Sequence, residues 1–376
     1  MTLNKTTLAG LACIALLAGC DSSSDSDDDN TITTRSIDAS SYSDTVYYQL
    51  DDLLAAPLTI TDPGTDTRWD IGFKRDKIIL NGGDSGSGSV EGALAAAQDS
   101  FYNTDGTPNE SVFLNATAAQ EGKTAFDSVT SAAELTGYLA DTNTSAIASA
   151  DWWSYNPATH AVSVKSDKGW IVRSSTGDSY ARVYVSALAP AAPPSRNLGS
   201  VTLNIAVQGS GETAFAAATD EVINFNDVVV CYDFDSKSTA DCTGNSWDLR
   251  IDPTGSYTIW LNGPIHGGGQ GAIAFGEAQP VAGQSALYTP PSVIPRWIPD
   301  GVTGIFSENS WYFYEPSQHK LWPNYRVYVL KEGNKRYKLQ VQSYYNSDGT
   351  SGHLSVAVEA LPDVEDTAQS QTNPHP

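Results

Sequence analysis

The sequence GDSG at residues 83–86 matches a motif that could carry a catalytic nucleophile, Ser85. The same order surrounds the reactive serine of trypsin-like proteases, in which a histidine acts as general base and an aspartate orients it. That histidine precedes the serine, but the first histidine of this chain is His160. The order of residues therefore argues against a hydrolase, and we expect no catalytic residues and no enzymatic activity.

Three other stretches look like cofactor sites but lack the required spacing. Gly122, Lys123 and Thr124 match the end of a phosphate-binding loop, but Thr117 stands where that loop needs a glycine. The run HGGGQG, residues 266–271, does not have the glycine spacing of a dinucleotide-binding loop. The run DSDDDN, near the N-terminus, fits a solvated acidic tether better than a calcium site.

The histidines are the remaining residues that could bind a metal. They are His160, His266, His319, His353 and His375. His160 and His319 occupy equivalent positions, each following a run of aromatic residues. An imidazole beside aromatic walls, such as Trp311 and Tyr314 next to His319, suits a flat, apolar, iron-bearing ligand such as haem. The same arrangement equally suits a sugar ring, or plain core packing beside a capped turn.

The composition favours an exported β protein. The 376 residues are enough for two domains, and 9 Trp, 18 Tyr, 31 Gly and 19 Pro favour strands and turns over helices. The formal net charge of −23 argues against nucleic acid and anionic membrane surfaces as partners.

The N-terminus predicts a lipoprotein signal peptide over residues 1–19. An apolar run over residues 8–17 is too short for a membrane-spanning helix, and the sequence LAGC that ends at Cys20 resembles a bacterial lipobox. That resemblance implies cleavage before Cys20 and lipidation of its thiol, so that the lipid is the membrane anchor. Residues 20–36 then form an acidic tether. An ordinary signal peptide followed by a chance cysteine is the alternative.

Two other cysteines remain in the mature chain, Cys231 and Cys242. In an oxidising compartment we expect them to form a disulfide, which would stabilise the fold by about 2–4 kcal/mol. A reactive or metal-binding pair is the weaker alternative, because no further cysteine could complete a metal site.

One passage of the chain occurs twice. The first copy contains WDI at residues 69–71 and LNG at residues 80–82. The second copy contains WDL at residues 247–249 and LNG at residues 261–263. Each copy is followed by an aromatic stretch with a histidine and then by two strand-like runs. The repetition indicates two homologous modules in tandem.

We place the modules at residues 37–212 and 213–362, with residues 363–376 as a disordered tail. Apolar residues recur with the period of strands, and Asn-Gly and Asp-Gly pairs mark turns between them. Each module is therefore expected to be an antiparallel β domain with at most a short helix. The best helical candidate is residues 124–138, which have a loose apolar face.

The order of these motifs resembles the HmuY family of haem-binding lipoproteins. The resemblance is sharpest in YRVYVLK, residues 325–331, and YKL, residues 337–339, and appears in the first module as WDIGF, NGG and GWIVR. It implies a mostly β fold and a lipid anchor, for which we favour the outer membrane or cell surface over the inner membrane. It also implies capture of haem, free or from a haemoprotein, for a TonB-dependent outer-membrane receptor.

The family pattern is met only in part. Founding members of the HmuY family hold iron between two axial ligands, His or Met, but the mature chain has no Met and the first module has only His160. In the second module His319 is the expected ligand, and His266 or His353 could pair with it. Haem binding could also be confined to that module, use one ligand, or be lost. The alternative function is surface adhesion or glycan binding through exposed aromatic residues, and the third is a purely structural lipoprotein.

Overall fold

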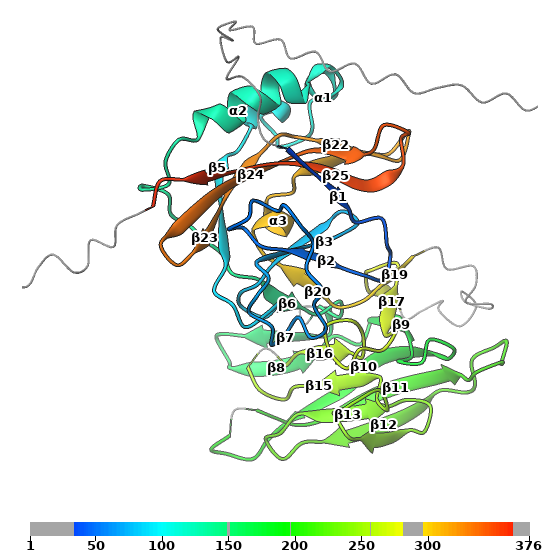
Figure 1. Ribbon diagram of the computed structural model, residues 1–376. Coiled ribbons are helices and arrows are strands. Elements are labelled where there is room, and N and C mark those ends of the chain that lie inside the picture. The colour runs from blue at the N-terminus through cyan, green and yellow to red at the C-terminus, as the bar shows by residue number, and fades with distance from the viewer. Residues whose placement is uncertain (1–33, 149–150, 196, 256, 281–295, 364–376) are drawn as a thin grey trace, which may run out of the picture.

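The computed structural model describes residues 34–148, 151–195, 197–255, 257–280 and 296–363. Within them the fold is mostly β, with antiparallel sheets and a few short helices, which confirms the predicted class. The strands form two bodies, one above the other in Figure 1. We call residues 34–144 together with 301–363 the split body, and residues 145–300 the central body. The predicted signal peptide, almost all of the tether and nearly all of the tail lie outside the described residues.

The split body is built on an antiparallel sheet with the strand order β1-β25-β24-β23-β5. These strands are β1 (Thr34–Asp38), β25 (Ser351–Leu361), β24 (Lys335–Tyr345), β23 (Val327–Glu332) and β5 (Glu91–Ala96). A smaller sheet contains β2 (Val46–Tyr48), β3 (Ile71–Lys74) and β4 (Lys77–Leu80), and a separate hairpin contains β21 (Tyr312–Glu315) and β22 (Lys320–Pro323). Both ends of the described chain therefore meet in one sheet.

The core of the split body lies between these sheets. Ile37 of β1, Phe73 of β3 and Leu339 of β24 are fully buried in it. The other face of the large sheet is covered by short helices, which lie along the top of Figure 1. The helical segments of this body are η1 (Asp99–Phe101), α1 (Glu110–Asn115), η2 (Ala118–Gly122), α2 (Lys123–Ser128) and α3 (Ile305–Glu308).

The helix expected at residues 124–138 is present but much shorter. Helix α2 ends at Ser128, and Val129 has the extended φ and ψ angles of −93° and 97°. Val129 and Thr130 are β-branched, which disfavours continuation of a helix. The apolar side chains of this segment are nevertheless used, because Phe126 and Val129 pack against Val329 of the sheet.

The central body contains two antiparallel sheets and a hairpin. The larger sheet has the order β12-β11-β10-β9-β17-β19, with β18 also paired to β9. Its strands are β12 (Thr219–Asn224), β11 (Leu198–Gln208), β10 (Tyr180–Pro190), β9 (Lys168–Arg173), β17 (Ala272–Ala274), β19 (Trp297–Ile298) and β18 (Gln279–Pro280). The smaller sheet orders β14 (Ser238–Ala240), β13 (Val230–Asp233), β15 (Leu249–Ile251) and β16 (Ile259–Leu261). The hairpin contains β7 (Trp153–Asn156) and β8 (Ala161–Val164).

A separate core fills the central body and includes Trp170, Val185, Leu203 and Ile251. The expected disulfide between Cys231 and Cys242 is present, with 5.3 Å between the Cα atoms. It joins β13 to the residues just after β14 and so closes the edge of the smaller sheet.

The two bodies have corresponding strand pairings, but each draws on both halves of the chain. In the split body Gly92 of β5 is opposite Leu330 of β23, and in the central body Ile273 of β17 is opposite Val172 of β9. The hydrophobic cores therefore divide the chain near residues 144 and 300, not at 212. The modules 37–212 and 213–362 stay a prediction about sequence repetition. In terms of these predicted modules, the first part of each module packs with the second part of the other module.

Two short strands join the bodies. They are β6 (Thr142–Thr144) and β20 (Gly301–Thr303), which pair antiparallel where the chain enters and leaves the central body. The hydroxyl groups of Thr142 and Thr303 lie 2.9 Å apart, which adds a side-chain contact to the pairing. Among the described residues, no helix is long and apolar enough to cross a membrane.

Candidate functional site

His319 lies at the tip of hairpin β21–β22, where its imidazole is exposed to solvent. Its Nδ1 atom is 2.5 Å from the hydroxyl oxygen of Tyr314, the third residue of β21. Tyr314 is itself 46% exposed, so the two rings form a polar and aromatic pair on the surface. Because this contact uses Nδ1, Nε2 is the ring nitrogen that faces a prospective ligand.

The turn that carries His319 is held in a fixed conformation. The buried carboxylate of Glu315 accepts the backbone N–H groups of Ser317 and Gln318, both at 2.7 Å. His319 has a φ of 55°, in the left-handed region that side chains other than glycine seldom occupy. Non-glycine residues in this region often occur at functional sites, although histidine, asparagine and aspartate adopt it more readily than most.

Aromatic side chains pack between hairpin β21–β22 and helix α1. Phe313 and Trp322 face each other across the strands with ring centroids 6.0 Å apart, and both lie near Phe113 of α1. Trp311, expected beside the ligand, is instead only 1% exposed. Its indole N–H donates to the carbonyl of Asp76 at 3.1 Å, so Trp311 is a core residue that anchors the base of the hairpin.

His160 repeats this arrangement in the central body. It is exposed at the tip of hairpin β7–β8, its φ is 56°, and its Nδ1 atom is 2.5 Å from the hydroxyl of Tyr155. The sequence placed the two histidines at equivalent positions, but the contact between each histidine and a tyrosine hydroxyl was not predicted. The signal was available in the sequence, because a tyrosine precedes each histidine by five residues.

His266 has different surroundings, in the loop after β16. Its ring lies edge-on to Trp260, and its Nδ1 atom is 3.5 Å from a guanidinium nitrogen of Arg250. Its Nε2 atom is buried and has no hydrogen-bond partner within the described chain. Burial, followed by the positive charge of Arg250, lowers the pKa of His266, which favours a neutral imidazole.

His353 lies on β25, opposite Asp38 of β1. Its Nδ1 atom is 3.5 Å from the Asp38 carboxylate, an ion pair when the imidazole is protonated. His266 belongs to the central body, whereas His319 and His353 belong to the split body. In the part of the chain that the structure describes, no recorded contact joins any two of these imidazoles, and His375 lies outside that part.

These surroundings can be compared with the needs of haem. A ligating imidazole usually has its second nitrogen fixed by a hydrogen bond, which sets the ring orientation. His319 and His160 meet this requirement, and both are accessible. Nε2 of His266 is buried and Nδ1 of His353 faces Asp38, and among the described residues neither imidazole contacts the hairpins, so the residues fit one protein ligand per hairpin better than a bis-histidine pair.

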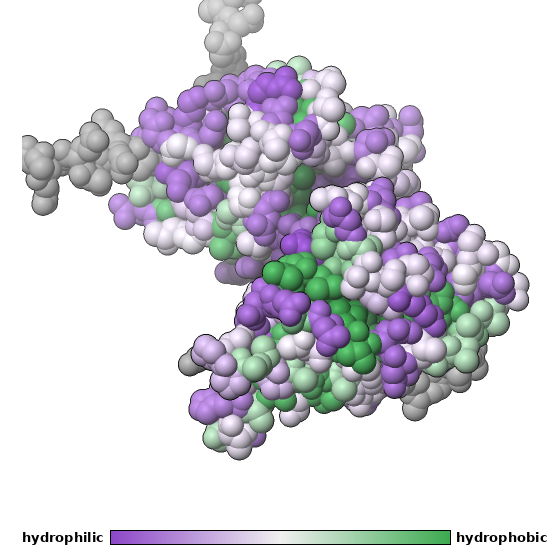
Figure 2. Space-filling view, turned by 90° about the horizontal axis from the view of Figure 1, so that it is seen from below, coloured by the Kyte–Doolittle hydropathy of each residue, from purple (hydrophilic) through white to green (hydrophobic). Residues whose placement is uncertain are grey.

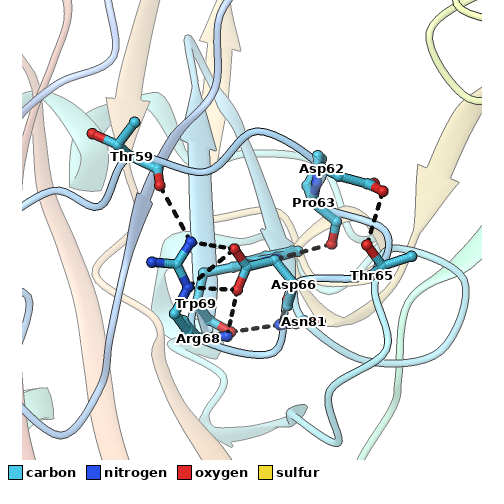
Figure 3. A network of polar contacts seen from close by, with 8 residues as sticks. All are labelled: Thr59, Asp62, Pro63, Thr65, Asp66, Arg68, Trp69 and Asn81. Atoms are coloured by element: carbon cyan, nitrogen blue, oxygen red, sulfur yellow. Dashed lines mark hydrogen bonds and ion pairs between the residues drawn. The ribbon is translucent and has the colours of Figure 1, made fainter.

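The Gly/Ser loop that begins at Asn81 has a structural role. The Asn81 side chain is fully buried and donates to the carbonyls of Trp69 and Asp66 at 2.6 and 2.9 Å, while its own oxygen accepts the N–H of Gly88 at 2.9 Å. Figure 3 shows Asn81 beside Trp69 and Asp66, together with the bond that the indole of Trp69 donates to the carbonyl of Pro63. Asn262 makes the corresponding bonds to Trp247 and Gly269.

Ser85, the nucleophile of the rejected protease motif, donates its hydroxyl to the carboxylate of Asp141 at 2.8 Å. Its recorded contact is therefore with a buried acid and not with a histidine. Asn81 and Asn262 each bind the backbone N–H seven positions later, and His266 is the counterpart of Ser85 because each lies four positions after its asparagine.

Four buried aspartates were not singled out from the sequence. Burial raises the pKa of Asp70, Asp141 and Asp300 to about 6. Burial likewise raises the pKa of Asp248 to about 7, although its carboxylate accepts the N–H groups of Ser175 and Phe234. Each of the four accepts at least one backbone N–H, so their role is to bind the main chain of a neighbouring segment.

One acidic group could hold a cation. Asp233, Asp235 and Asp248 offer oxygens within 4.8 Å of one another. However, each already accepts hydrogen bonds from the protein: Asp233 from two backbone N–H groups, and Asp235 from the hydroxyl of Ser179. These donors offset part of the negative charge without a metal.

The surface offers shallow hollows and exposed aromatic residues. Two hollows in the split body have volumes of about 270 and 320 Å³, and neither is lined by a histidine. The large apolar side chains described as exposed are Tyr42, Leu114, Tyr155, Val222, Val228 and Tyr314. On the face seen from below, apolar residues gather in patches between hydrophilic ones (Figure 2). Both hairpin tyrosines therefore belong to a small set of exposed large side chains.

The chain can also be compared with known proteins. Among curated proteins, none matches the sequence. A family model described as HmuY protein matches residues 41–197. This segment runs from the split body into the central body.

Solved structures give weaker likenesses. A candidate lipoprotein from Bacteroides fragilis is 12% identical with a TM-score of 0.29, and covers 88% of this chain and 92% of its own. The apo HmuY analogue of Tannerella forsythia is 10% identical with a TM-score of 0.29, and covers 89% and 97%. A candidate HmuY-like haem-binding protein from Bacteroides vulgatus is 12% identical with a TM-score of 0.15, and covers 35% and 83%. The family model confirms the resemblance seen in the motifs over residues 41–197 of this chain.

Proposed function

We propose that this protein binds haem or a related tetrapyrrole at hairpin β21–β22, with His319 as the axial ligand to iron. The observation that carries the proposal is the 2.5 Å contact between Nδ1 of His319 and the hydroxyl of Tyr314 on an exposed turn. That contact fixes the ring and leaves Nε2 for iron, which is how proteins usually prepare a histidine ligand. The match to the HmuY family over residues 41–197 supports the same ligand class.

The hairpin supplies what a tetrapyrrole needs apart from the iron ligand. The exposed Tyr314 ring offers an aromatic face beside the imidazole. Phe313 and Trp322, packed against α1, keep the strands from shifting. When bound, haem would supply an iron centre, and the protein would hold it without a catalytic step. The arrangement favours a single protein ligand, because neither His266 nor His353 contacts this hairpin.

We further propose that the protein acts as an exported lipoprotein in haem or iron acquisition. Lipidation at Cys20 would anchor it at the outer membrane or cell surface, and a TonB-dependent receptor would take the haem. The lipobox-like sequence before Cys20 supports this. Expression with labelled fatty acid should label the membrane-associated protein, and Cys20→Ser should abolish both the label and the association. Unchanged membrane association of Cys20→Ser would contradict the anchor.

Haem binding is tested by titrating the chain that follows residue 20 with hemin and recording Soret absorbance. A saturable Soret change is expected, and it should weaken in His319→Asn. Asparagine is the preferred replacement because it tolerates the left-handed backbone that His319 adopts, so that lost binding does not reflect strain. No saturable change would overturn the proposal.

The matched control is His353→Asn, which removes an imidazole of the same body outside the hairpin. It should leave the Soret change intact. Tyr314→Phe removes only the hydroxyl, and should keep binding while altering the affinity or the Soret maximum. Equal weakening in His353→Asn would show that His319 is not the specific ligand.

Glycan binding is the second candidate, since exposed Tyr314 and Tyr155 could also stack against sugar rings. A chain that shows no Soret change with hemin but binds an oligosaccharide array, and loses that binding in Tyr314→Ala, would favour this function.

A further inference from the structure

The two histidine hairpins are equivalent in geometry. The tyrosine hydroxyl lies 2.5 Å from histidine Nδ1 in both, and the ring centroids are 6.0 Å apart for Tyr155 and His160, and 6.1 Å apart for Tyr314 and His319. The backbone angles φ of the two histidines differ by one degree, 56° and 55°. The distance, the ring separation and the uncommon backbone angle therefore all recur in the second hairpin.

The strands that present the pairs also correspond. Tyr155 is opposite Val162 in β7–β8, and Tyr314 is opposite Leu321 in β21–β22. In both turns the polar side chain of the residue directly after the tyrosine caps the loop. Asn156 accepts the N–H groups of Ala158 and Thr159, as Glu315 does for the corresponding residues.

The two tyrosine–histidine pairs are also similarly exposed to solvent. Tyr155 is 49% exposed and Tyr314 is 46% exposed, and both histidines are exposed at the hairpin tips. A flat ligand that can reach one pair can therefore reach the other. The two pairs stand on separate cores, so occupation of one does not require residues of the other.

The hairpins differ in their supporting side chains. Phe313 and Trp322 lie in the split body where Ser154 and Ser163 lie in the central body, at the same paired positions. The central hairpin is supported instead by Trp153, whose ring centroid is 4.9 Å from that of Tyr257. Less apolar surface beside β7–β8 means that its ligand affinity should be lower.

We infer that the pair Tyr155–His160 is a second tetrapyrrole site, so that one chain takes up two tetrapyrroles, one on each body. This rests on the proposed function at His319. It departs from the alternative in which haem binding is confined to the second module, because each hairpin needs only one imidazole.

The test is the stoichiometry of hemin binding to the chain that follows residue 20, measured by Soret titration and by gel filtration followed by iron analysis. The wild-type chain should bind two equivalents, with the weaker one lost in His160→Asn and the tighter one lost in His319→Asn. The double variant should bind none above background, and His353→Asn should keep two. Far-ultraviolet circular dichroism and thermal unfolding establish that each variant is folded.

Failure of this inference can be told apart from failure of the proposed function. One equivalent in the wild-type chain, unchanged in His160→Asn and lost in His319→Asn, would overturn the second site and keep the first. Two equivalents that persist in His160→Asn would also overturn it. No saturable binding at all would overturn both. Tyr155→Phe gives a further readout, since it should shift the Soret spectrum of the weaker component while two equivalents remain.

Discussion

Asp141 and Asp300 hold the same place in the two bodies. Each is buried, and each accepts at 2.8 Å the backbone N–H of the leucine that precedes an Asn-Gly pair, Leu80 for the first and Leu261 for the second. Each is followed at once by one of the two strands, β6 and β20, that pair where the bodies join. The two carboxyl groups thus fix both ends of the junction.

This relationship predicts that stability falls as pH rises. An aspartate in an unfolded chain loses its proton near pH 4, whereas the pKa of Asp141 and of Asp300 is raised to about 6 in the fold. Between these values the folded chain binds more protons, so the free energy of unfolding decreases with pH and then levels off above about pH 7. The loss should be on the order of 1–3 kcal/mol for each aspartate, measurable by urea denaturation between pH 4 and pH 8.

The variant Asp141→Asn/Asp300→Asn should be less stable at pH 5 but show a smaller decrease towards pH 8. Asp105→Asn is the control, because Asp105 is exposed in a loop and its hydrogen bonds to Thr107 lower its pKa. It should keep the pH slope of the wild-type chain. The explanation fails if the double variant has that slope as well.

The packing of β5 against β23, which exchanges partners between the two modules predicted from the sequence, implies a specific crosslink. Glu91 of β5 is opposite Lys331 of β23, and their side chains form an ion pair at 2.9 Å. The variant Glu91→Cys/Lys331→Cys should therefore form a disulfide within one chain under mild oxidation. Non-reducing electrophoresis and mass spectrometry of the linked peptides would detect it.

The control tests the unexchanged alternative. Arg173 holds in β9 the position that Lys331 holds in β23, and in the structure it lies opposite Ala272. If each module packed only with itself, Glu91 would instead lie opposite Arg173. Glu91→Cys/Arg173→Cys should give no intrachain disulfide. A crosslink in this variant and none in the first would show that the modules are not exchanged.

The sequence predicted the elements better than their partners. The strand-like runs at 180–188 and 201–208, and those at 336–345 and 353–360, are the long hairpins β10–β11 and β24–β25, because alternation of apolar residues is a local signal. Which hairpin packs on which earlier strand depends on contacts far apart in the chain. The two similar passages of sequence offer each hairpin two similar candidate partners, so the pattern of residues does not distinguish between them.

Only part of the candidate site could be predicted, because the rest depends on contacts between residues far apart in the chain. The equivalence of His160 and His319 followed from spacing alone, whereas the burial of Trp311 and the separation of His266 from His319 depend on packing. Alternation also failed locally at Ala187, which is exposed although Val183 and Val185 are buried. A register shift between Val185 and Ala187 marks a bulge, which turns the following side chains.

The disulfide predicts a loss of stability on reduction. Cys231 and Cys242 close a loop of eleven residues at the edge of the smaller sheet of the central body. Cys231→Ser/Cys242→Ser should lower the free energy of unfolding by about 2–3 kcal/mol, because the unfolded chain is no longer constrained. Guanidinium denaturation of the variant and of the oxidised wild-type chain provides the measurement. Equal midpoints would show that the bond adds nothing to stability.

The buried amide of Asn81 predicts a pH-dependent defect in Asn81→Asp. The carboxylate could still accept from Gly88, but it could not donate to the carbonyls of Trp69 and Asp66 and would repel them. The free energy of unfolding should fall by about 2–4 kcal/mol at pH 7.5. The loss should be smaller at pH 4.5, where a protonated carboxyl can donate one of the two bonds.

Asn346→Asp is the matched control for this defect. The Asn346 side-chain oxygen accepts the N–H groups of Asp348 and Thr350 at 3.0 and 2.8 Å, and a carboxylate can accept both. This variant should therefore be about as stable as the wild-type chain at both pH values. Asn262→Asp should resemble Asn81→Asp but with a smaller loss, because its amide donates over longer distances, 2.9 Å to Trp247 and 3.2 Å to Gly244. If Asn81→Asp were as stable as Asn346→Asp, donation by the buried amide would not be what holds the loop.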